Sequence, residues 1–412
     1  MSTLQLVDVE HWPAVARTPY SPVRAAAARQ ILRGAMRDLP VVVLLPDGRR
    51  LGAGGAGAPV MEIVSDSFFH RIGADLKIGL GESYMAGNWR VGRGTDLADL
   101  LSVFASRVSH LVPPVLQRFR KLIEQRMPSS EDNDRQGARA NIARHYDLSN
   151  DLFATFLDST MTYSSAWFSA PTDGFGELAE AQQRKIDGIL DYAGVRAGSR
   201  VLEIGTGWGQ LAIQAAERGA TITSVTLSAE QRDLARKRIA EAGVNATVEL
   251  RDYRDVQGQY DAVVSVEMIE AVGERYWPTY FATIDRLLAP GGRFGLQSIT
   301  MPHDRLLATR HAQGWIHKYI FPGGLIPSLT AIDQIAATAG GLEVVERRDL
   351  GPDYAHTLRL WRDRFTSRAD DVANLGFDAV FRRMWDFYLA YSEAGFRAGY
   401  LGVSQLALAR KD

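Results

Sequence analysis

Three glycines at alternate positions, Gly205, Gly207 and Gly209, carry the first chemical signal in this chain. They follow a mainly apolar stretch, residues 201–204, and precede a segment with helical character, residues 210–218. A strand, a tight glycine turn and a helix start, in this order, let a backbone approach a nucleotide-like ligand closely. The spacing G-x-G-x-G differs from the dinucleotide fingerprint G-x-G-x-x-G, so no pyrophosphate is expected. Ordinary α/β proteins also use glycine in tight turns, so this turn by itself leaves both interpretations open.

Polar residues follow two further expected strands, where other parts of such a ligand would lie. S-adenosylmethionine, which has no pyrophosphate, needs hydrogen-bonding groups for its ribose and a contact for its adenine. Asp252 and Tyr253 come directly after the third expected strand, and the acid Glu203 precedes the glycine turn. The second strand ends without an acid, and the cofactor-binding candidates there are Thr226, Leu227, Ser228 and Gln231, of which Ser228 and Gln231 have capping-box spacing.

Strand and helix patterns alternate after residue 177 and would position these residues. Their order implies an α/β fold with a doubly wound, mostly parallel sheet. Ligands in such sheets bind at the carboxyl ends of the strands, where the glycine turn stands. Strands are expected over residues 200–204, 221–226, 248–250, 260–266, 293–299, 343–346 and 400–408, and helices over residues 177–192, 228–242 and 277–288.

Residues 1–126 are interpreted as a smaller N-terminal α+β domain. Strands are expected over residues 40–46 and 60–64 and a helix over residues 96–108. Residues 79–89 mix glycines with bulky aromatics, and we interpret them as a packed corner rather than a ligand contact. The polar residues 127–137 predict a linker, which leaves residues 138–412 as the second domain.

A second helix of the first domain is expected after Pro113 and Pro114. It carries apolar residues on one side, with Arg118, Arg120 and Lys121 around them. A basic amphipathic helix of this kind can lie on an anionic membrane. A solvated charged face on a helix packed against its own domain explains the same pattern, so both interpretations stay open.

Composition excludes several classes of function. The 412 residues have a formal net charge of -1, with 46% hydrophobic and 23% charged residues, so we expect a globular protein without a nucleic-acid partner. The chain has no cysteine and its eight histidines lack any H-x-x-x-H pair, so we predict no disulfide, thiolate nucleophile or metal site. Neither a signal peptide nor an apolar run of about eighteen residues is found, which favours a cytoplasmic protein.

Several longer motifs are more specific than the glycine turn: HYDLSNDLF at 145–153, MTYSSAWF at 161–168, VTLS at 225–228 and KYIFPGG at 318–324. Together with the glycine turn they resemble the cyclopropane-fatty-acid synthase family of methyltransferases over residues 140–400, and residues 81–89 extend the resemblance into the first domain. Three motifs are most similar to the actinobacterial branch that makes 10-methylene fatty acyl chains, the precursors of tuberculostearate: EMIEAVG at 267–273, QSITMPH at 297–303 and YSEAGFR at 391–397.

The resemblance implies a Rossmann-like class I methyltransferase fold that uses S-adenosylmethionine. The implied reaction transfers a methyl group to the double bond of an unsaturated, oleoyl-type phospholipid acyl chain at the inner face of the membrane. A hydride shift and loss of a proton then give a 10-methylene product, and the alternative, ring closure, gives a cyclopropane. Methylation of a soluble small molecule would leave the first domain unexplained. An inactive lipid-binding module would not explain the intact glycine turn and Glu270.

A base must take the proton in either case, and in the family this base is thought to be a bound bicarbonate. The residues implied to hold it here are Glu270, Tyr354, Ile299, Ser165 and Gln297. Ser165 stands where the family has a cysteine, which matters little if the backbone N–H makes the contact. Gln297 replaces a histidine, and glutamine cannot carry a proton near neutral pH, which favours the methylene branch.

Further residues have structural as well as functional interpretations. Tyr163 and Ser164 are implied to contact the carboxylate of the cofactor. Glu270 is equally explained as a carboxylate at a helix surface or helix start, and Tyr354 as a core residue. The expected partners include a separate flavin- or NADPH-type reductase, because a methylene product needs reduction and the chain has no flavin or nicotinamide fingerprint. Homo-oligomerisation is left open.

Overall fold

The computed structural model describes residues 7–111, 128, 133–134, 137–138, 149–170 and 174–411. The chain divides into two compact units. Unit 1 comprises Met1–Met127, Ala312–Ile320 and Arg362–Tyr400, and unit 2 comprises Pro128–His311, Phe321–Trp361 and Leu401–Asp412. The expected division into residues 1–126, 127–137 and 138–412 differs from these units, because two later segments cluster with unit 1. The assignment of a lipid-related role to the N-terminal part stays a prediction.

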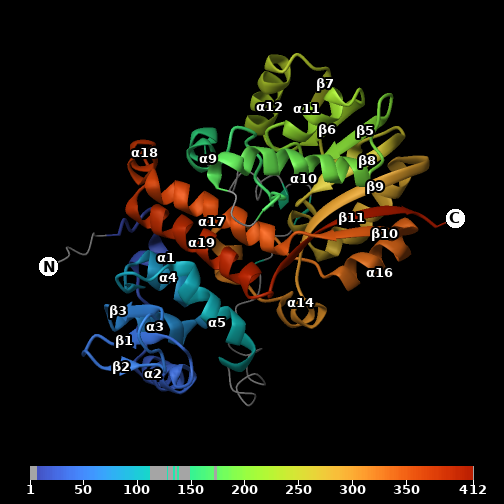
Figure 1. Cartoon of the computed structure of the whole chain (residues 1–412). Coiled ribbons are helices and arrows are strands. Elements are labelled where there is room, and N and C mark those ends of the chain that lie inside the picture. Colours follow the sequence, from blue (N-terminus) through green and yellow to red (C-terminus); the bar gives the residue numbers. More distant parts are fainter. Residues whose placement is uncertain are drawn as a thin grey trace. The chain divides into compact units, whose positions relative to one another are not determined.

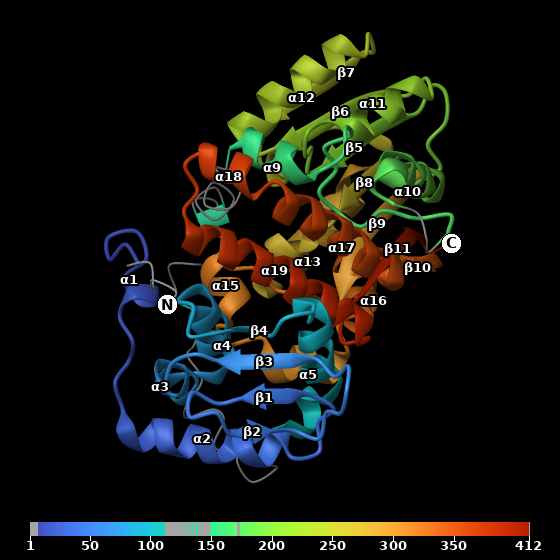
Figure 2. The same cartoon turned by 60° about the vertical axis from the view of Figure 1, so that its left-hand side comes forward.

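Unit 1 contains a four-stranded sheet in the order β2-β1-β3-β4. Strands β1 and β3 are parallel neighbours, which Figure 2 shows as two arrows pointing the same way, and the other pairs are antiparallel. The expected strands and the helix near residue 100 are confirmed. The strands are β1 (Val42–Leu44), β2 (Arg50–Leu51), β3 (Val60–Ile63) and β4 (Trp89–Val91), and the helices are α1 (Pro13–Ala16), α2 (Pro22–Met36), α3 (Ser67–Ala74), α4 (Leu76–Met85), α5 (Leu97–Leu111), α15 (Trp315–Tyr319), α18 (Ala369–Asn374) and α19 (Ala379–Arg397).

The prediction of a packed corner over residues 79–89 is wrong about the backbone conformation, because Gly79 and Gly81 lie inside helix α4. An added Cβ at Gly79 would lie 2.4 Å from the carbonyl oxygen of Arg71, and one at Gly81 would lie 2.5 Å from the Trp315 ring. The glycines therefore serve the close approach of neighbouring elements rather than a turn, and only the packing part of the interpretation holds.

The motif at 318–324 also has a structural role within unit 1. Glu82, which follows the two glycines, is buried and accepts hydrogen bonds from Lys318 Nζ at 2.6 Å and Tyr319 Oη at 2.7 Å. The guanidinium of Arg71, itself buried, lies 3.5 Å from the other Glu82 oxygen. Because a buried carboxylate is costly without partners, these contacts account for Glu82 in the one motif and for Lys318 and Tyr319 in the other.

Unit 2 contains a seven-stranded sheet in the order β10-β11-β9-β8-β5-β6-β7. Strands β5 to β9 pair in parallel, and β11 is antiparallel to both β9 and β10, as expected for a mostly parallel α/β sheet. The strands are β5 (Arg200–Ile204), β6 (Thr221–Thr226), β7 (Ala246–Leu250), β8 (Tyr260–Val266), β9 (Leu288–Thr300), β10 (Leu342–Asp349) and β11 (Gly402–Arg410).

Strand β9 begins earlier than the sequence indicated. Pro290, Gly291 and Gly292, which precede the expected strand 293–299, lie within β9. Leu288 pairs with Tyr260, and the register then shifts before Ala262 pairs with Arg293. The extra residues are therefore accommodated as an irregularity of the strand rather than as a separate turn.

Helices cover both faces of the unit 2 sheet (Figure 1). Alternate residues of β5 face opposite sides, as strand geometry requires. Leu202 and Ile204 pack with residues of α13 and α16, whereas Val201 packs with residues of α10, α11 and α12. The elements outside the sheet are α9 (Asn150–Phe156), η2 (Phe175–Glu177), α10 (Leu178–Tyr192), α11 (Gln210–Glu217), α12 (Ala229–Glu241), η3 (Tyr253–Asp255), η4 (Ile269–Ala271), η5 (Glu274–Tyr276), α13 (Trp277–Leu287), α14 (His303–Thr309), α16 (Leu329–Gly340) and α17 (Gly351–Ser367), whose last residues belong to unit 1.

Two expected features lie outside the described residues: the basic helix with Arg118, Arg120 and Lys121, and most of the linker 127–137. The same holds for residues 145–148 at the start of the HYDLSNDLF motif. Among the helices that the structure describes, none combines the length and the apolar character needed to cross a membrane.

Substituting Gly79 is expected to destabilise the protein, because the Cβ of Gly79→Ala would overlap the Arg71 backbone. Overpacking of this kind costs about 1–3 kcal/mol. Gly34→Ala is the matched control, since Gly34 lies in α2 with no atom within 4 Å of an added Cβ, and alanine favours a helix by about 1 kcal/mol. The midpoint of urea unfolding, followed by circular dichroism, should fall for Gly79→Ala and stay or rise for Gly34→Ala. Equal midpoints would contradict the close approach.

Candidate active site

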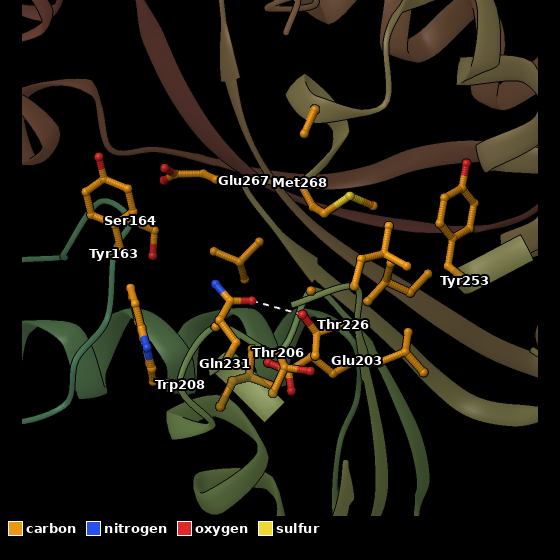
Figure 3. Close-up of a pocket in the computed structure, with 18 of the residues that line it drawn as sticks. Tyr163, Ser164, Glu203, Thr206, Trp208, Thr226, Gln231, Tyr253, Glu267 and Met268 are labelled. Atoms are coloured by element: carbon orange, nitrogen blue, oxygen red, sulfur yellow. Dashed lines mark hydrogen bonds between the residues drawn. The ribbon is translucent and has the colours of Figure 1, made fainter. Parts of the chain in front are cut away.

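A cavity lies at the carboxyl ends of β5, β6 and β8 in unit 2 (Figure 3). It brings together all but two of the predicted cofactor-binding residues. Those that line it are Tyr163, Ser164, Glu203, Gly205, Gly207, Thr226, Leu227, Gln231, Asp252 and Tyr253. The position agrees with the rule that ligands of doubly wound sheets bind beyond the carboxyl ends of the strands.

The glycine turn contributes to this cavity and to the packing behind it. Gly205 and Gly207 line the cavity with φ values of +97° and +52°, in the left-handed region that favours glycine. Gly209 (φ +90°) is instead the N-cap of α11, and an added Cβ there would lie 3.0 Å from the Cβ of Ala235. Gly209 therefore lets α11 and α12 approach each other and is not among the lining residues.

The end of β6 is held by hydrogen bonds among its own polar residues. Ser228 caps α12 by accepting the Gln231 N–H at 3.2 Å, which confirms one half of the expected capping box. The Gln231 side chain does not return to Ser228; its Oε1 accepts a hydrogen bond from Thr226 Oγ1 at 2.9 Å (Figure 3). Thr226 and Gln231 thus face the cavity, while Ser228 has a structural role as a cap.

The residues after β7 differ in their availability to a ligand. Asp252 is buried and accepts two hydrogen bonds from the guanidinium of Arg254, at 2.8 and 2.6 Å. Tyr253 packs edge-on against Tyr280, with 5.5 Å between ring centroids. Its hydroxyl is buried and has no hydrogen-bond partner among the described residues, and desolvation raises its pKa. Arg254, which the sequence analysis did not identify, thus neutralises Asp252 through its two hydrogen bonds, whereas the Tyr253 hydroxyl has no such partner in the part of the chain that the structure describes.

A buried lysine adds a positive charge that sequence reasoning missed. Lys185 in α10 lines the cavity and donates a hydrogen bond from Nζ to Ser164 Oγ at 2.7 Å. Desolvation lowers its pKa to about 8, although nearby carboxylates, Glu267 first, oppose this shift. Glu203, also buried, accepts a hydrogen bond from Ser224 Oγ at 2.5 Å, and desolvation raises its pKa to about 8. In the sequence, Lys185 is an ordinary charged residue of a helix and gives no distinguishing signal.

Three of the five predicted catalytic residues meet at a glutamate that was not predicted. The backbone N–H of Ser165 donates to Glu267 Oε1 at 2.9 Å, and Gln297 Nε2 donates to the same oxygen at 2.8 Å. Tyr354 Oη donates to Glu267 Oε2 at 2.7 Å. Glu267 lines the cavity on the side of Tyr163 and Ser164 (Figure 3). An acid directly after a buried parallel strand, at the ligand edge of the sheet, was the signal that could have identified it.

The other two predicted catalytic residues, Glu270 and Ile299, contact each other. Glu270 Oε1 accepts hydrogen bonds from the Ile299 N–H at 2.5 Å and from Ser298 Oγ at 2.9 Å. Its Oε2 is buried and has no hydrogen-bond partner among the described residues. Desolvation, and next the charge of Glu267, raise the pKa of Glu270 to about 8. Glu270 is therefore neither exposed at a helix surface nor in direct contact with the three donors around Glu267.

The two glutamates form a coupled pair with unequal support. Desolvation raises the pKa of Glu267, but three hydrogen bonds and the charge of Lys185 oppose the rise. Glu270 has fewer donors and one oxygen without a partner among the described residues, and the charge of Glu267 adds to the rise of its pKa, so Glu270 is the more easily protonated of the two. Glu267, whose three hydrogen-bond donors favour its ionised form, is the member of the pair that lines the cavity.

The residues present fit S-adenosylmethionine but not the expected bicarbonate. One cavity is lined by two glycines in the left-handed conformation, by the polar side chains of Thr226 and Gln231 at the end of β6, and by the hydrogen-bonded pair of Lys185 and Ser164. This set of groups suits a ligand that has an amino-acid part and a nucleoside part. The donors expected for bicarbonate are Ser165 N–H, Gln297 Nε2, Tyr354 Oη and Ile299 N–H. Each already donates to a glutamate of this chain, so this set does not fit an additional anion.

An aromatic cluster adjoins the two tyrosines of the site. Tyr163 stacks on Trp361, with 5.2 Å between ring centroids, and contacts Phe153 edge-on at 5.1 Å. Tyr354 meets the same tryptophan at 6.3 Å. Phe153 and Trp361 are fully buried, so this side of the site is apolar and dry.

Comparisons with known proteins agree with the geometry. The profile of the mycolic acid cyclopropane synthetase family matches residues 133–406. The chain is 55% identical to tuberculostearic acid methyltransferase UfaA1 of Mycobacterium tuberculosis, over 98% of this chain and 96% of that protein. It is 34% identical to the cyclopropane-fatty-acyl-phospholipid synthase of Escherichia coli K12, over 86% and 89%. The crystal structure of mycolic acid cyclopropane synthase CmaA1 with SAH and CTAB matches with a TM-score of 0.60 at 31% identity, over 66% of this chain and 97% of that one.

The fold class and the use of S-adenosylmethionine, both predicted from the sequence, are confirmed by these relatives. The chain belongs to the mycolic acid cyclopropane synthetase family and is an S-adenosylmethionine-dependent methyltransferase.

Proposed function

We propose that this enzyme methylates the double bond of an unsaturated, oleoyl-type phospholipid acyl chain and releases a 10-methylene acyl product. The observation that carries the proposal is a carboxylate, Glu267, that accepts three hydrogen bonds in the cavity that also contains the glycine turn. Methylation of an oxygen or nitrogen atom does not require a base that removes a proton from carbon. The 55% identity to a tuberculostearic acid methyltransferase supports the substrate class.

The proposed roles in cofactor binding follow from the directions of the side chains. Gly205 and Gly207 lie under the amino-acid part, and Gln231 keeps its Nε2 donors for the ribose because Thr226 already occupies its Oε1. Ser164 accepts a hydrogen bond from Lys185, so its own hydroxyl hydrogen is left to donate to the cofactor carboxylate. When bound, S-adenosylmethionine supplies an electrophilic methyl group on its sulfonium.

The acyl chain undergoes the bond changes. The alkene electron pair forms a bond to the methyl carbon as the bond from that carbon to sulfur breaks, which leaves a cation on the neighbouring chain carbon. A hydride moves from the methylated carbon to this neighbour, and loss of a proton from the new methyl group forms the exocyclic double bond. Tyr163, which lines the cavity and stacks on the buried Trp361, supplies an aromatic surface that keeps water from the cation and stabilises it.

Cyclopropane synthesis is the second candidate. It differs only in that ring closure accompanies proton loss, without the hydride shift. The 34% identity to a cyclopropane-fatty-acyl-phospholipid synthase favours it. The same residues would hold the cofactor and the base in both reactions, so only the product distinguishes the two.

The proposed substrate has consequences for where the enzyme acts and which partner proteins it needs. Because the acyl chain lies in a bilayer, we propose that the protein acts at the inner face of the membrane, bound peripherally, with the N-terminal part as its membrane-associated domain. The methylene product requires a separate flavin- or NADPH-type reductase to become a methyl branch. A homo-oligomer is compatible with this function.

The acyl product is tested by mass spectrometry. Purified protein incubated with S-adenosylmethionine and dioleoyl phospholipid vesicles is expected to add one CH2 unit to the oleoyl chain, while vesicles with saturated stearoyl chains stay unchanged. Ozonolysis should cleave the product, because an exocyclic methylene is an alkene; a resistant product would indicate a cyclopropane. No mass gain, with the cofactor bound, would exclude this acyl substrate.

The role of Lys185 is tested by cofactor affinity. Lys185→Met is expected to weaken binding of S-adenosylhomocysteine about tenfold, the loss typical of a charge-assisted hydrogen bond. The pKa of Lys185 is about 8, so its charge is present at pH 7 and is lost as the pH rises; wild-type affinity should fall above pH 8, and the variant should lack this fall.

Isothermal titration between pH 6.5 and about 9 gives both quantities. Lys237→Met is the matched control, since that lysine is exposed on α12 and pairs only with Glu241 at 3.8 Å in the described contacts. A Lys185→Met variant with unchanged affinity and an unchanged pH profile would remove Lys185 from the site.

A further inference from the structure

We propose that the side chain of Glu267 is itself the catalytic base and takes the place of a dissociable anion such as bicarbonate. The inference rests on the proposed function, because it concerns the proton that the methylated acyl chain loses. A free anion would need donors that converge from several directions on one point. In this chain such donors converge on the carboxylate of Glu267, from three segments far apart in the sequence: Ser165 before α10, Gln297 in β9 and Tyr354 in α17.

The backbone of Glu267 supports a functional role. Its φ of +49° lies in the left-handed region, which is strained for a glutamate and favourable for a glycine. The Glu267 N–H donates to the Gln297 carbonyl oxygen at 2.8 Å, which holds the loop in this conformation against β9. Strain that surrounding structure maintains is typical of functional positions. Here it directs a carboxylate into the cavity.

The surrounding charges keep this carboxylate ready to accept a proton. Both Glu267 oxygens accept hydrogen bonds, which favour the ionised carboxylate, whereas Glu270 has one oxygen without a partner among the described residues. The amide of Gln297 is fixed in turn, because Gln405 Nε2 donates to Gln297 Oε1 at 3.0 Å, which leaves Gln297 Nε2 directed at Glu267. A glutamine that donates cannot compete for the proton as a histidine would.

The step is balanced without a further reactant. A C–H bond of the new methyl group breaks, its electron pair forms the carbon–carbon double bond, and the proton moves to a Glu267 oxygen. The cation on the chain is thereby neutralised, and Glu267 becomes a neutral acid. The proton leaves to solvent after product release, when the cavity opens to water, and the carboxylate is restored.

The first test removes the base while keeping its shape. Glu267→Gln should lower the rate of oleoyl methylation by about 100-fold or more, the contribution typical of a general base. Binding of S-adenosylhomocysteine should change little, because Glu267 acts after cofactor binding. Glu274→Gln is the matched control: this nearby glutamate pairs with Arg310 at 2.8 Å and has no role in the proposed site. A Glu267→Gln variant with near wild-type activity would overturn the proposal.

The second test asks whether a free anion can replace the side chain. Wild-type activity in buffers freed of carbon dioxide should equal that with added bicarbonate. Glu267→Gly relaxes the backbone and leaves the three donors without their carboxylate, so this variant should be inactive alone and regain activity, saturably, with bicarbonate or formate. A purely structural role for Glu267 would not give rescue by small anions. Wild-type activity that depends on bicarbonate would overturn the proposal and leave the proposed function intact.

A binding measurement separates the two hypotheses when no product forms. Carbon-13 NMR of labelled bicarbonate should show no binding to the wild type and binding to Glu267→Gly, and neither result requires the acyl substrate. If the wild type binds bicarbonate, the base assignment is wrong whatever the substrate. If the binding results are as expected but oleoyl chains are not methylated, the anion-replacing position of Glu267 is supported and the proposed acyl substrate is excluded.

Discussion

The site depends on one constraint: a carboxylate that is largely removed from water must have several donors directed at it. Glu267 meets this requirement with a backbone N–H, an amide and a phenol, which come from three different parts of unit 2. None of these donors is close to Glu267 in sequence, so the sheet order that places β8 beside β9 is what brings Gln297 to it. Removal of any donor would leave a partly desolvated charge unsupported, which is costly in a low-dielectric site.

Charges around the cavity are arranged in opposing pairs. Lys185 is buried near the carboxylates of Glu203 and Glu267, and each of these groups has its pKa moved toward neutrality by desolvation. Buried groups whose pKa values are shifted in this way are typical of sites that bind ligands or transfer protons. Burial of these charged groups costs free energy of folding, and the same burial shifts their pKa values and so changes their reactivity.

The neighbouring elements explain why the cofactor end and the base end share one cavity. The glycine turn after β5 and Glu267 after β8 follow adjacent parallel strands, so both lie at the same edge of the sheet. The backbone is left-handed after both strands. After β5 the residues in this conformation are glycines, which let a ligand approach closely, and after β8 the residue is Glu267, whose side chain points into the cavity. Gly209 and Ser228 are the N-caps of α11 and α12 and have structural roles there without lining the cavity.

Local patterns in the sequence determined the strands β5, β6 and β8, the glycine turn and the Ser228 cap, because apolar periodicity, left-handed glycine and capping act over a few residues. The residues that meet at the site, Ser165, Gln297 and Tyr354, were indicated by the resemblance of longer motifs to a known family and not by these local patterns. Only the tertiary structure decided which acid these residues contact. Glu267 and Glu270 lie three positions apart and look equivalent in sequence, but their side chains point to different donors on β9 and α17. The prediction of a corner at Gly79 and Gly81 was wrong for the same reason. These glycines are required by close packing against Arg71 and Trp315, and the residues next to them in the sequence do not identify those partners.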